Sequence, residues 1–176
     1  MDHLCIVSTG GTIDKIYFDD KSSFQVGAPQ IGEILQAIGV AFTFDVIPII
    51  RKDSLHITGE DRALVRRTIE AQPSRHVLVT HGTDTMVETA QVLAGIPGKV
   101  IVLTGALNPA RFQGSDAVFN IGTAVGAGSP STATGTAVAA PSESAMAGCV
   151  AGTSVGMDVR TAVGTAPRQS FPEPQP

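Results

Sequence analysis

The sequence has few charged residues, only two cysteines and no tryptophan. Charged residues make up 16% of its 176 residues, against about 25% in typical globular proteins, and the formal net charge is -4. It contains no basic patch and no block of like charge, so nucleic acid and an anionic membrane surface are poor candidate partners. Cys5 and Cys149 lie far apart in the chain, which argues against a disulfide framework and against metal-ligand spacing.

The sequence also lacks the apolar segments that secretion or membrane insertion requires. Met1–His3 leads directly into a short apolar run, without the basic region and the long apolar region of a signal peptide. No apolar run approaches the ~20 residues of a membrane-spanning helix. We therefore expect a soluble, cytoplasmic protein, and its length suits one domain that buries its own core.

What the sequence does have is an alternation of short apolar runs with segments of helical periodicity. Strands are predicted at Leu4–Val7, Phe42–Ile50, Val77–Val79 and Lys99–Leu103. Helices are predicted from Pro29 to Gly39, from Thr58 to about Ala71, from Met86 to Gly95 and at Asp116–Val125. Strands that alternate with helices imply parallel pairing and right-handed crossovers. The sequence therefore predicts an α/β fold with a doubly wound, mainly parallel sheet flanked by helices.

Two segments fall outside this regular pattern. Asp14–Gly27 is polar with scattered aromatic residues, and we expect it to be a mobile loop. After about Gly128, leucine, isoleucine and lysine disappear, and Ala, Gly, Ser, Thr and Pro dominate. We therefore predict a catalytic domain at residues 1–128 and a weakly structured or disordered tail at 129–176, in which Ala137–Ala140 could form a weak edge strand.

A polar turn follows each predicted strand. The turns are Ser8–Thr12, Asp53–Ser54, Thr80–Thr85 and Gly105–Pro109. Parallel strands present their carboxyl ends at one edge of a sheet, and doubly wound sheets bind ligands beyond that edge. The third turn packs hydroxyls, a carboxylate and an imidazole into six residues, which is more than a connector needs. The sequence therefore predicts that these turns gather into one site.

The residues in these turns suit hydrolysis or binding of a small molecule. Thr12 or Thr83 could act as a nucleophile if a base lies within hydrogen-bonding reach. Backbone amides near Gly11 and Gly82 could stabilise an oxyanion. From the residues alone, we predict a small-molecule hydrolase or binding protein.

Three other polar side chains have alternative interpretations. Asp84 could hold a cationic group such as a substrate amine, or Thr83 or Asp84 could cap the following helix. Tyr17 lies on a segment that could close over the site, or it anchors that segment by packing. His81 could be a general base, but a turn residue that satisfies backbone groups is favoured because no Ser/His/Asp arrangement is evident.

Two of the turns resemble the signature motifs of a known family. Ser8–Ile13 (STGGTI) and His81–Met86 (HGTDTM) are similar, in sequence and in order, to the two motifs of the L-asparaginase/glutaminase family. Thr104–Pro109 and Ser115–Asn120 also resemble segments of that family. The resemblance covers residues 4 to about 125, which correspond to the family's amino-terminal catalytic domain. It is strongest to the short-chain asparaginases.

The resemblance implies an amidohydrolase of asparagine catabolism that needs neither a cofactor nor a metal. Such an enzyme hydrolyses the side-chain amide of L-asparagine to L-aspartate and ammonia. Thr12 would be the nucleophile, with Tyr17 as its activator. Thr83 would belong to a second hydroxyl group that acts on the same carbonyl.

The resemblance also implies how the substrate is bound. Asp84 would bind the substrate α-amino group, and Ser54, within Asp53–Ser54, would bind its α-carboxylate. Gly11 and Gly82 would complete the substrate-binding site. A homo-oligomer, either a dimer or a tetramer, is expected because the open edge of the site needs cover.

The sequence departs from the family pattern at two catalytic positions. In two-domain members a tyrosine occupies the position that matches Phe24 here, so Tyr17 would have to substitute for it. The family's second catalytic group includes a lysine downstream of the fourth strand, where this chain has none. Its lysines are Lys15, Lys21, Lys52 and Lys99. Arg160 is nearest in place, but a guanidinium does not readily release a proton.

These departures leave two alternatives open. One is a glutaminase or another small amidase, and the other is a catalytically impaired relic that binds an amino acid without turnover. A change of reading frame in the gene at about residue 128 would explain both the absent lysine and the altered tail. Sequencing the coding DNA tests this hypothesis, and a family-like tail in neither alternative frame would exclude it.

Overall fold

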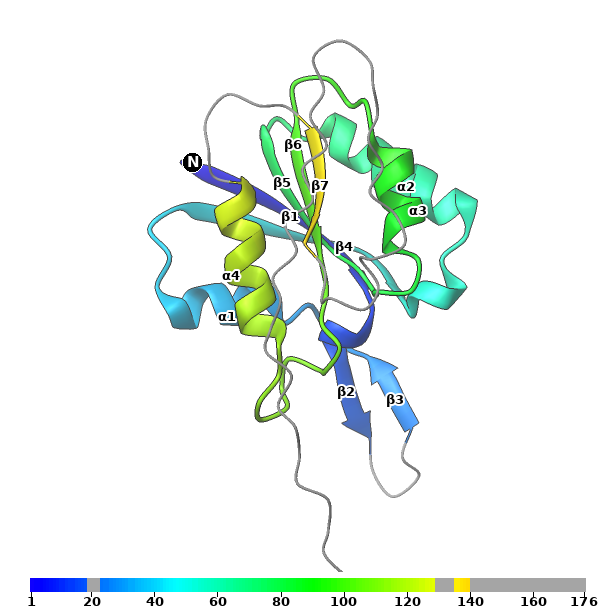
Figure 1. Cartoon of the computed structure of the whole chain (residues 1–176), viewed down its shortest axis with the longest axis vertical. Coiled ribbons are helices and arrows are strands. Elements are labelled where there is room, and N and C mark those ends of the chain that lie inside the picture. The colour runs from blue at the N-terminus through cyan, green and yellow to red at the C-terminus, as the bar shows by residue number, and fades with distance from the viewer. Residues whose placement is uncertain (19–22, 129–134, 140–176) are drawn as a thin grey trace, which may run out of the picture.

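The computed structural model describes residues 1–18, 23–128 and 135–139, and its centre is a five-stranded parallel sheet (Figure 1). In spatial order its strands are β4 (Thr43–Lys52), β1 (His3–Gly10), β5 (His76–Thr80), β6 (Val100–Thr104) and β7 (Gly135–Ala139). Every neighbouring pair is parallel. Numbered along the chain, these strands stand in the order 2-1-3-4-5, a doubly wound arrangement. The predicted fold class is confirmed.

In the described residues, four α-helices cover the two faces of this sheet. They are α1 (Ile31–Ile38), α2 (Gly59–Ala71), α3 (Met86–Leu93) and α4 (Ala117–Gly128). Helices α1 and α4 pack on one face, and α2 and α3 pack on the other (Figure 1). The consequence is a three-layer arrangement with a hydrophobic core on each side of the sheet. The expectation that all crossovers have one hand is wrong: the connections from β5 to β6 and from β6 to β7 step in the same direction, but their helices α3 and α4 lie on opposite faces.

The central strand β1 contributes to both cores, because successive side chains of a strand point to opposite faces. Cys5 and Val7 pack with α2 and α3, whereas Leu4 and Ile6 pack with α1 and α4. All four are at most 3% exposed, so Cys5 is a buried apolar residue of the strand. Burial on both faces explains why this strand is a continuous apolar run in the sequence.

Local sequence signals set the ends of the helices. The hydroxyl of Thr58 accepts from the amide of Asp61 at 3.2 Å, and the Asp61 carboxylate accepts from the amide of Thr58 at 2.8 Å. This reciprocal pair is a capping box, and it begins α2. Helix α1 ends at Gly39, whose φ of 72° is in the left-handed region that glycine adopts without strain.

A β-hairpin replaces the mobile loop that was expected after Asp14. Strands β2 (Lys15–Phe18) and β3 (Ser23–Val26) pair antiparallel, with Tyr17 opposite Phe24 in the ladder. The hairpin projects from the carboxyl edge of the main sheet (Figure 1). The expectation was wrong because the polar residues of this segment obscured two short runs rich in aromatic and β-branched residues, which favour strands.

The edge strand β7 overlaps the weak strand that was expected at Ala137–Ala140, and it pairs with β6. The rest of the predicted tail, which includes Cys149 and Arg160, lies outside the described residues. None of the helices in the described ranges is long and apolar enough to cross a membrane.

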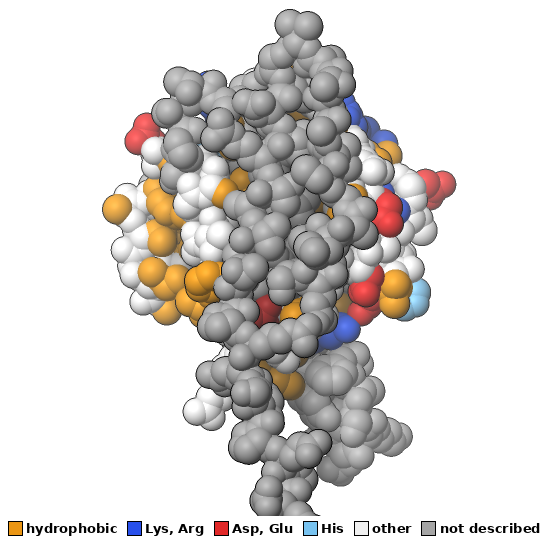
Figure 2. All heavy atoms as spheres, viewed as in Figure 1, with side chains coloured by type: hydrophobic (Ala, Val, Ile, Leu, Met, Phe, Trp, Pro, Cys, Tyr) orange, Lys and Arg blue, Asp and Glu red, His pale blue; other side chains and the backbone are white. Residues whose placement is uncertain are grey.

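The two sides of the molecule differ in surface character. In the view of Figure 2, apolar side chains gather on the side of α1 and α4, and most charged side chains lie toward α2 and α3. Helix α4 contains no charged residue. The exposed apolar residues of this side include Ile38, Leu107, Val118 and Phe119.

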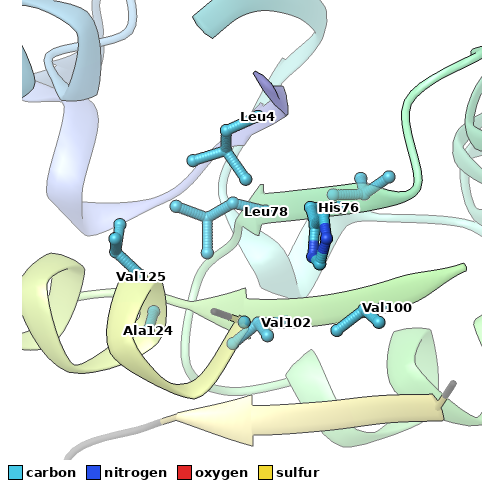
Figure 3. Close-up of a pocket in the computed structure, with 9 residues that line it drawn as sticks. Leu4, His76, Leu78, Val100, Val102, Ala124 and Val125 are labelled. Carbon is cyan, nitrogen blue, oxygen red and sulfur yellow. The ribbon is translucent and has the colours of Figure 1, made fainter. Parts of the chain in front are cut away.

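A small apolar pocket lies between the sheet and α4, near the amino-terminal ends of the strands (Figure 3). The residues that line it include Leu4, His76, Leu78, Val100, Val102 and Ala124. This position is opposite to the edge where the polar turns lie, and no predicted site residue is among the described residues that line it.

Candidate active site

The polar turns that follow β1, β4, β5 and β6 lie against one another at the carboxyl edge of the sheet. A Cβ atom on Gly11 would lie 2.5 Å from the backbone nitrogen of Gly82, and one on Gly82 would lie 2.5 Å from Oγ of Ser54. Gly105, which follows β6, lies directly against the carbonyl of His81. Only glycine permits such close approach of two backbones. The predicted gathering of the turns is therefore confirmed.

The first and third turns flank the point at which the winding of the sheet reverses. Strands β1 and β5 are neighbours, but the chain leaves β1 for α1 on one face and leaves β5 for α3 on the other (Figure 1). In doubly wound proteins this reversal opens a crevice beyond the carboxyl ends of the strands, where ligands bind. Thr12 and Thr83 belong to the two turns at this point.

Thr12 and Thr83 are both half-buried. Thr12 opens a 3-10 turn (Thr12–Asp14) directly after Gly11, whose φ of 88° turns the chain out of β1. The amide of Gly11 donates to the carbonyl of Lys52 at 3.0 Å. This amide is therefore engaged within the protein, and another backbone amide would have to stabilise an oxyanion here. The partial exposure of both threonines leaves them accessible to a small ligand.

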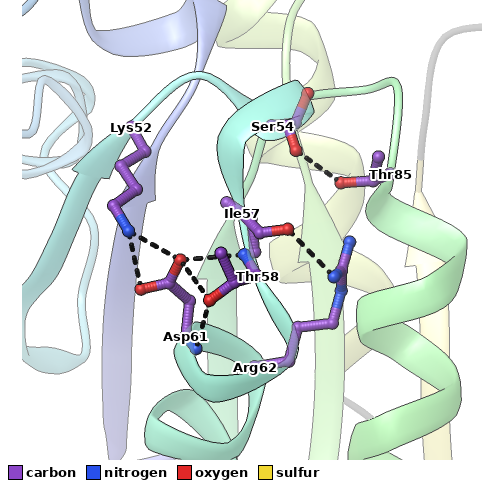
Figure 4. A network of polar contacts seen from close by, with 7 residues as sticks. All are labelled: Lys52, Ser54, Ile57, Thr58, Asp61, Arg62 and Thr85. Atoms are coloured by element: carbon purple, nitrogen blue, oxygen red, sulfur yellow. Dashed lines mark hydrogen bonds and ion pairs between the residues drawn. The ribbon is translucent and has the colours of Figure 1, made fainter.

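Ser54 and Asp84 form a polar pair between the second and third turns. Ser54 is 1% exposed, and its hydroxyl donates to Oδ2 of Asp84 at 2.9 Å. The carbonyl of Ser54 accepts from the hydroxyl of Thr85, also at 2.9 Å (Figure 4). Asp84 is exposed, so its carboxylate can receive a cationic group from solution.

The alternative in which Thr83 or Asp84 caps the following helix is wrong. Helix α3 begins at Met86 with Thr85 at the N-cap position, and no side chain makes a capping hydrogen bond there. The Asp84 carboxylate bonds to Ser54 instead, because the third turn folds back over the second.

Asp53 lies beside Ser54, but its carboxylate is engaged within the protein. It forms an ion pair with Lys15 of β2 at 2.7 Å and accepts from the amide of Leu55 at 3.2 Å. The hydrogen bond from Lys15 holds the pKa of Asp53 below its usual range. The pair ties the base of the hairpin to the second turn. The predicted part of Asp53 in substrate binding stays a prediction.

Asp14 is a buried residue beside the turn of Thr12 that the sequence gave no reason to single out. Its side chain is 1% exposed and accepts from the hydroxyl of Ser8 at 3.0 Å and from the amide of Gln30 at 2.9 Å. Burial raises its pKa to about 6, although these two hydrogen bonds and the charge of Arg51 act in the opposite direction. The carboxylate thus joins the end of β1, the turn of Thr12 and the beginning of α1.

His81 is fully buried beneath the third turn. Its Nδ1 lies 2.7 Å from the carbonyl oxygen of Gly82, and its Nε2 lies 2.8 Å from the hydroxyl of Thr89. Burial lowers its pKa, which favours the neutral ring. The favoured interpretation, a turn residue that satisfies backbone groups, is confirmed.

Of the predicted site residues, Tyr17 is placed only in part. Tyr17 stands in β2, directly after the turn of Thr12, and its side chain lies outside what the structure describes. Lys52 pairs with Asp61 at 2.7 Å. Lys99 begins the approach to β6, where it donates to backbone carbonyls at the opposite edge of the sheet. The Nζ atoms of both lysines are therefore engaged with groups outside the turns of Thr12 and Thr83.

The match to known proteins covers most of the chain. The family model described as the amino-terminal part of asparaginase matches residues 3–157. This match extends past residue 128, where the composition of the sequence changes.

Relatives at the level of whole proteins are similar over the same region. L-asparaginase of Bacillus licheniformis is 32% identical over 130 residues, which cover 69% of this chain and 40% of the Bacillus protein. Glutaminase-asparaginase of Acinetobacter glutaminasificans is 30% identical over 140 residues, which cover 70% of this chain and 41% of that protein.

A solved structure shares the arrangement of strands and helices. The thermostable L-asparaginase from Thermococcus kodakarensis matches with a TM-score of 0.60 and 27% sequence identity, over 72% of this chain and 40% of that one. The chain thus spans about two fifths of the length of these relatives. From the family match and the two motifs that meet at the sheet edge, we conclude that this chain belongs to the asparaginase family.

Proposed function

We propose that this protein hydrolyses the side-chain amide of L-asparagine to L-aspartate and ammonia. The observation that carries the proposal is the contact between three turns, which brings Thr12, Ser54 and Asp84 to one edge of the sheet. A hydroxyl nucleophile and an exposed carboxylate next to a buried hydroxyl suit a substrate that has an amide at one end and an amino acid at the other. The names of the relatives from Bacillus and Acinetobacter support the same reaction.

The Ser54–Asp84 pair would recognise the amino-acid end of the substrate. The exposed Asp84 carboxylate would accept charge-assisted hydrogen bonds from the α-ammonium group. The Ser54 hydroxyl has one proton, which it now donates to Asp84. On binding, this proton would turn to the substrate α-carboxylate, while the ammonium group takes its place on Asp84. Asp53 would contribute by fixing this turn through its bonds to Lys15 and Leu55.

Thr12 would carry out the first chemical step. Its Oγ attacks the carbon of the side-chain amide while Tyr17 takes up the hydroxyl proton. Backbone amides of the Gly82 turn would stabilise the oxyanion, and the close approach allowed by Gly11 brings that turn to Thr12. The C–N bond then breaks, and the leaving group takes up the proton held by Tyr17 and departs as ammonia. An aspartyl ester remains on Thr12.

Water would complete the reaction. With Thr83 acting on the same carbonyl, water attacks the ester, the bond to Thr12 breaks, and L-aspartate is released with a restored threonine hydroxyl. The sum is one amide and one water converted to one acid and one ammonia. No lysine follows Lys99 in the sequence, so the second step would have to proceed without the lysine of the family's second catalytic group.

Two alternatives have specific support. L-glutamine is a second candidate substrate because the Acinetobacter relative is named for both activities. A binding relic without turnover is a second candidate role because of the absent lysine.

Ammonia release separates these possibilities. Purified protein is assayed with L-asparagine and with L-glutamine, beside Thr12→Ala and Thr83→Ala. We expect release from L-asparagine, and a loss of roughly 10³-fold or more in each variant with unchanged circular dichroism. A near-normal rate in either variant would overturn the role given to that threonine. No release by the wild type, with a melting temperature that L-asparagine still raises, would favour the binding relic.

We also propose that the protein is a cytoplasmic homo-oligomer. The uncharged helix α4 and the exposed Leu107, Val118 and Phe119 support an interface on this side of the molecule (Figure 2). Sedimentation at micromolar concentration tests the assembly, and a purely monomeric protein would contradict it.

A further inference from the structure

A chain of hydrogen bonds runs from α2 to the turn that carries Thr83. Arg62 of α2 donates through Nη1 to the carbonyl of Ile57 at 3.1 Å (Figure 4), and through Nε to the hydroxyl of Thr89 at 3.1 Å. Thr89, on α3, is fully buried, and its hydroxyl lies 2.8 Å from Nε2 of His81. The chain ends at the carbonyl of Gly82, 2.7 Å from Nδ1 of His81.

The direction of each bond in this chain follows from its partners. A carbonyl oxygen only accepts, so Nδ1 of His81 must hold the proton that is directed at Gly82. In the neutral ring Nε2 is then an acceptor, and Thr89 must donate to it. The competing acceptor for that single hydroxyl proton, the carbonyl of Thr85, is farther away at 3.3 Å. Because Arg62 can only donate, every bond points the same way, from the guanidinium to the Gly82 carbonyl.

The hydrogen bond from His81 to Gly82 fixes more than the carbonyl oxygen that accepts it. The carbonyl of Gly82 and the amide nitrogen of Thr83 belong to the same planar peptide unit, so fixing the oxygen also fixes the direction of the Thr83 N–H. Gly82 has little freedom on its other sides, because it lies against Gly11 and against the side chain of Ser54. At the other end of this chain of hydrogen bonds, Arg62 donates to the carbonyl of Ile57, the residue that follows the turn of Ser54.

We propose that Arg62, Thr89 and His81 form a positioning relay that sets the peptide between Gly82 and Thr83 relative to Ser54 and Thr12. None of the three contacts the substrate in the proposed reaction. They act through Thr83 and through the turn of Ser54. The kinetic part of this inference rests on the proposed asparagine hydrolysis, whereas its structural part, a fixed Thr83 peptide, does not.

Thr89→Val is the most selective way to break the relay. Valine keeps the shape of threonine but removes the hydroxyl that Arg62 and His81 share. Thr89→Ser restores the hydroxyl and serves as the conservative variant. Thr123→Val is the matched control, because Thr123 is also a helix residue whose hydroxyl bonds to the carbonyl four residues earlier, at 2.9 Å, but on α4 and away from the turns.

The kinetic test measures kcat and KM for L-asparagine at a temperature where circular dichroism shows every variant folded. We expect Thr89→Val to lose roughly 10- to 100-fold in kcat/KM, the scale expected for a displaced reacting group. Thr89→Ser and Thr123→Val should stay within about threefold of the wild type. A folded Thr89→Val protein with wild-type kcat and KM would overturn the relay, since a purely structural threonine would lower stability only.

A second readout keeps the inference testable if the wild type shows no turnover, in which case the proposed function fails by itself. Nitrogen NMR of His81 should show the proton on Nδ1 in the wild type. Thr89→Val should shift the amide resonance of Thr83 far more than Thr123→Val does. A proton on Nε2 in the wild type, or an unmoved Thr83 amide in Thr89→Val, would overturn the relay.

Discussion

At the scale of single residues, Asp14 makes the stability of the fold depend on pH. The pKa of its carboxyl is about 6 in the folded protein, against 3.8 for the free side chain, because burial disfavours the charged form. Between these two values the folded state keeps a proton that the unfolded state has released. Stability from this group is therefore greatest below pH 3.8, falls as the pH rises through about 6, and is lower by about 3 kcal/mol above that range.

Asp14→Asn should remove this slope. Asparagine can still accept from the amide of Gln30 with its oxygen and can donate to the hydroxyl of Ser8, but it carries no charge. The difference in unfolding free energy between wild type and variant, measured by urea denaturation from pH 4 to pH 7.5, should therefore change in favour of the variant by about 2.5 kcal/mol. A difference that does not vary with pH would show that the Asp14 carboxyl is not buried as described.

The proposed binding of the substrate α-ammonium group by Asp84 leads to a prediction about KM. Asp84→Asn should raise KM for L-asparagine by roughly 10- to 100-fold, because a hydrogen bond between charged groups is lost at the α-ammonium. Glu88→Gln, an exposed acidic residue of α3, is the matched control and should leave KM within about twofold.

Succinamic acid, which is asparagine without its α-amino group, tests whether Asp84 acts on that group. Its KM should be the same with wild type and with Asp84→Asn, because this substrate has no amino group for the carboxylate to bind. An equal loss on both substrates would contradict the role given to Asp84.

Which residues could be placed from the sequence depended on whether a local pattern marks their position. The positions of Thr12, Thr83 and Asp84 at the carboxyl edge of the sheet could be predicted because each lies in a short polar turn directly after an apolar strand. Arg62 and Thr89 could not, because they meet only after α2 and α3 pack side by side on one face of the sheet. Nothing in the local sequence around Asp14 indicates that its carboxylate turns inward to Ser8 and Gln30.

At the scale of elements, the close contact of the turns makes Gly11 hard to replace. Gly11→Ala would force a residue with a side chain to adopt a φ of 88° and would place Cβ 2.5 Å from the nitrogen of Gly82. We expect a loss of about 1–3 kcal/mol of unfolding free energy in urea, together with loss of ammonia release.

Gly59→Ala is the control for that substitution. Gly59 begins α2, and a Cβ there meets nothing within 4 Å. Alanine is the better helix former, so this variant should be unchanged or more stable by up to about 1 kcal/mol and should keep its activity. Equal behaviour of the two variants would contradict the contact between the first and third turns.

The elements themselves were predictable to different degrees. The start of helix α2 could be predicted from the sequence, because a capping box is a local signal that tertiary packing did not override. The hairpin of β2 and β3 was missed, because its strands are short and take no part in the main sheet. Its position depends on a distant contact, the ion pair between Lys15 and Asp53.

At the scale of the whole molecule, the order of the strands creates the site. The chain begins in the middle of the sheet, crosses to β4 through α1 on one face, and returns past β1 to β5 through α2 on the other face. This reversal places the turns of β1 and β5 side by side, although their motifs are some seventy residues apart in the sequence. The fold class alone therefore sufficed to predict that the polar turns meet, whereas the contacts between them required the structure.

The central claim is that Thr12 takes up the aspartyl group of L-asparagine. The most direct test is mass spectrometry of the protein quenched in acid during turnover, followed by digestion to locate any added mass. We predict an aspartyl group on the amino-terminal peptide, at Thr12, and none in the Thr12→Ala protein. Ammonia release without any adduct on that peptide, or with the adduct on the peptide of Thr83, would contradict the claim.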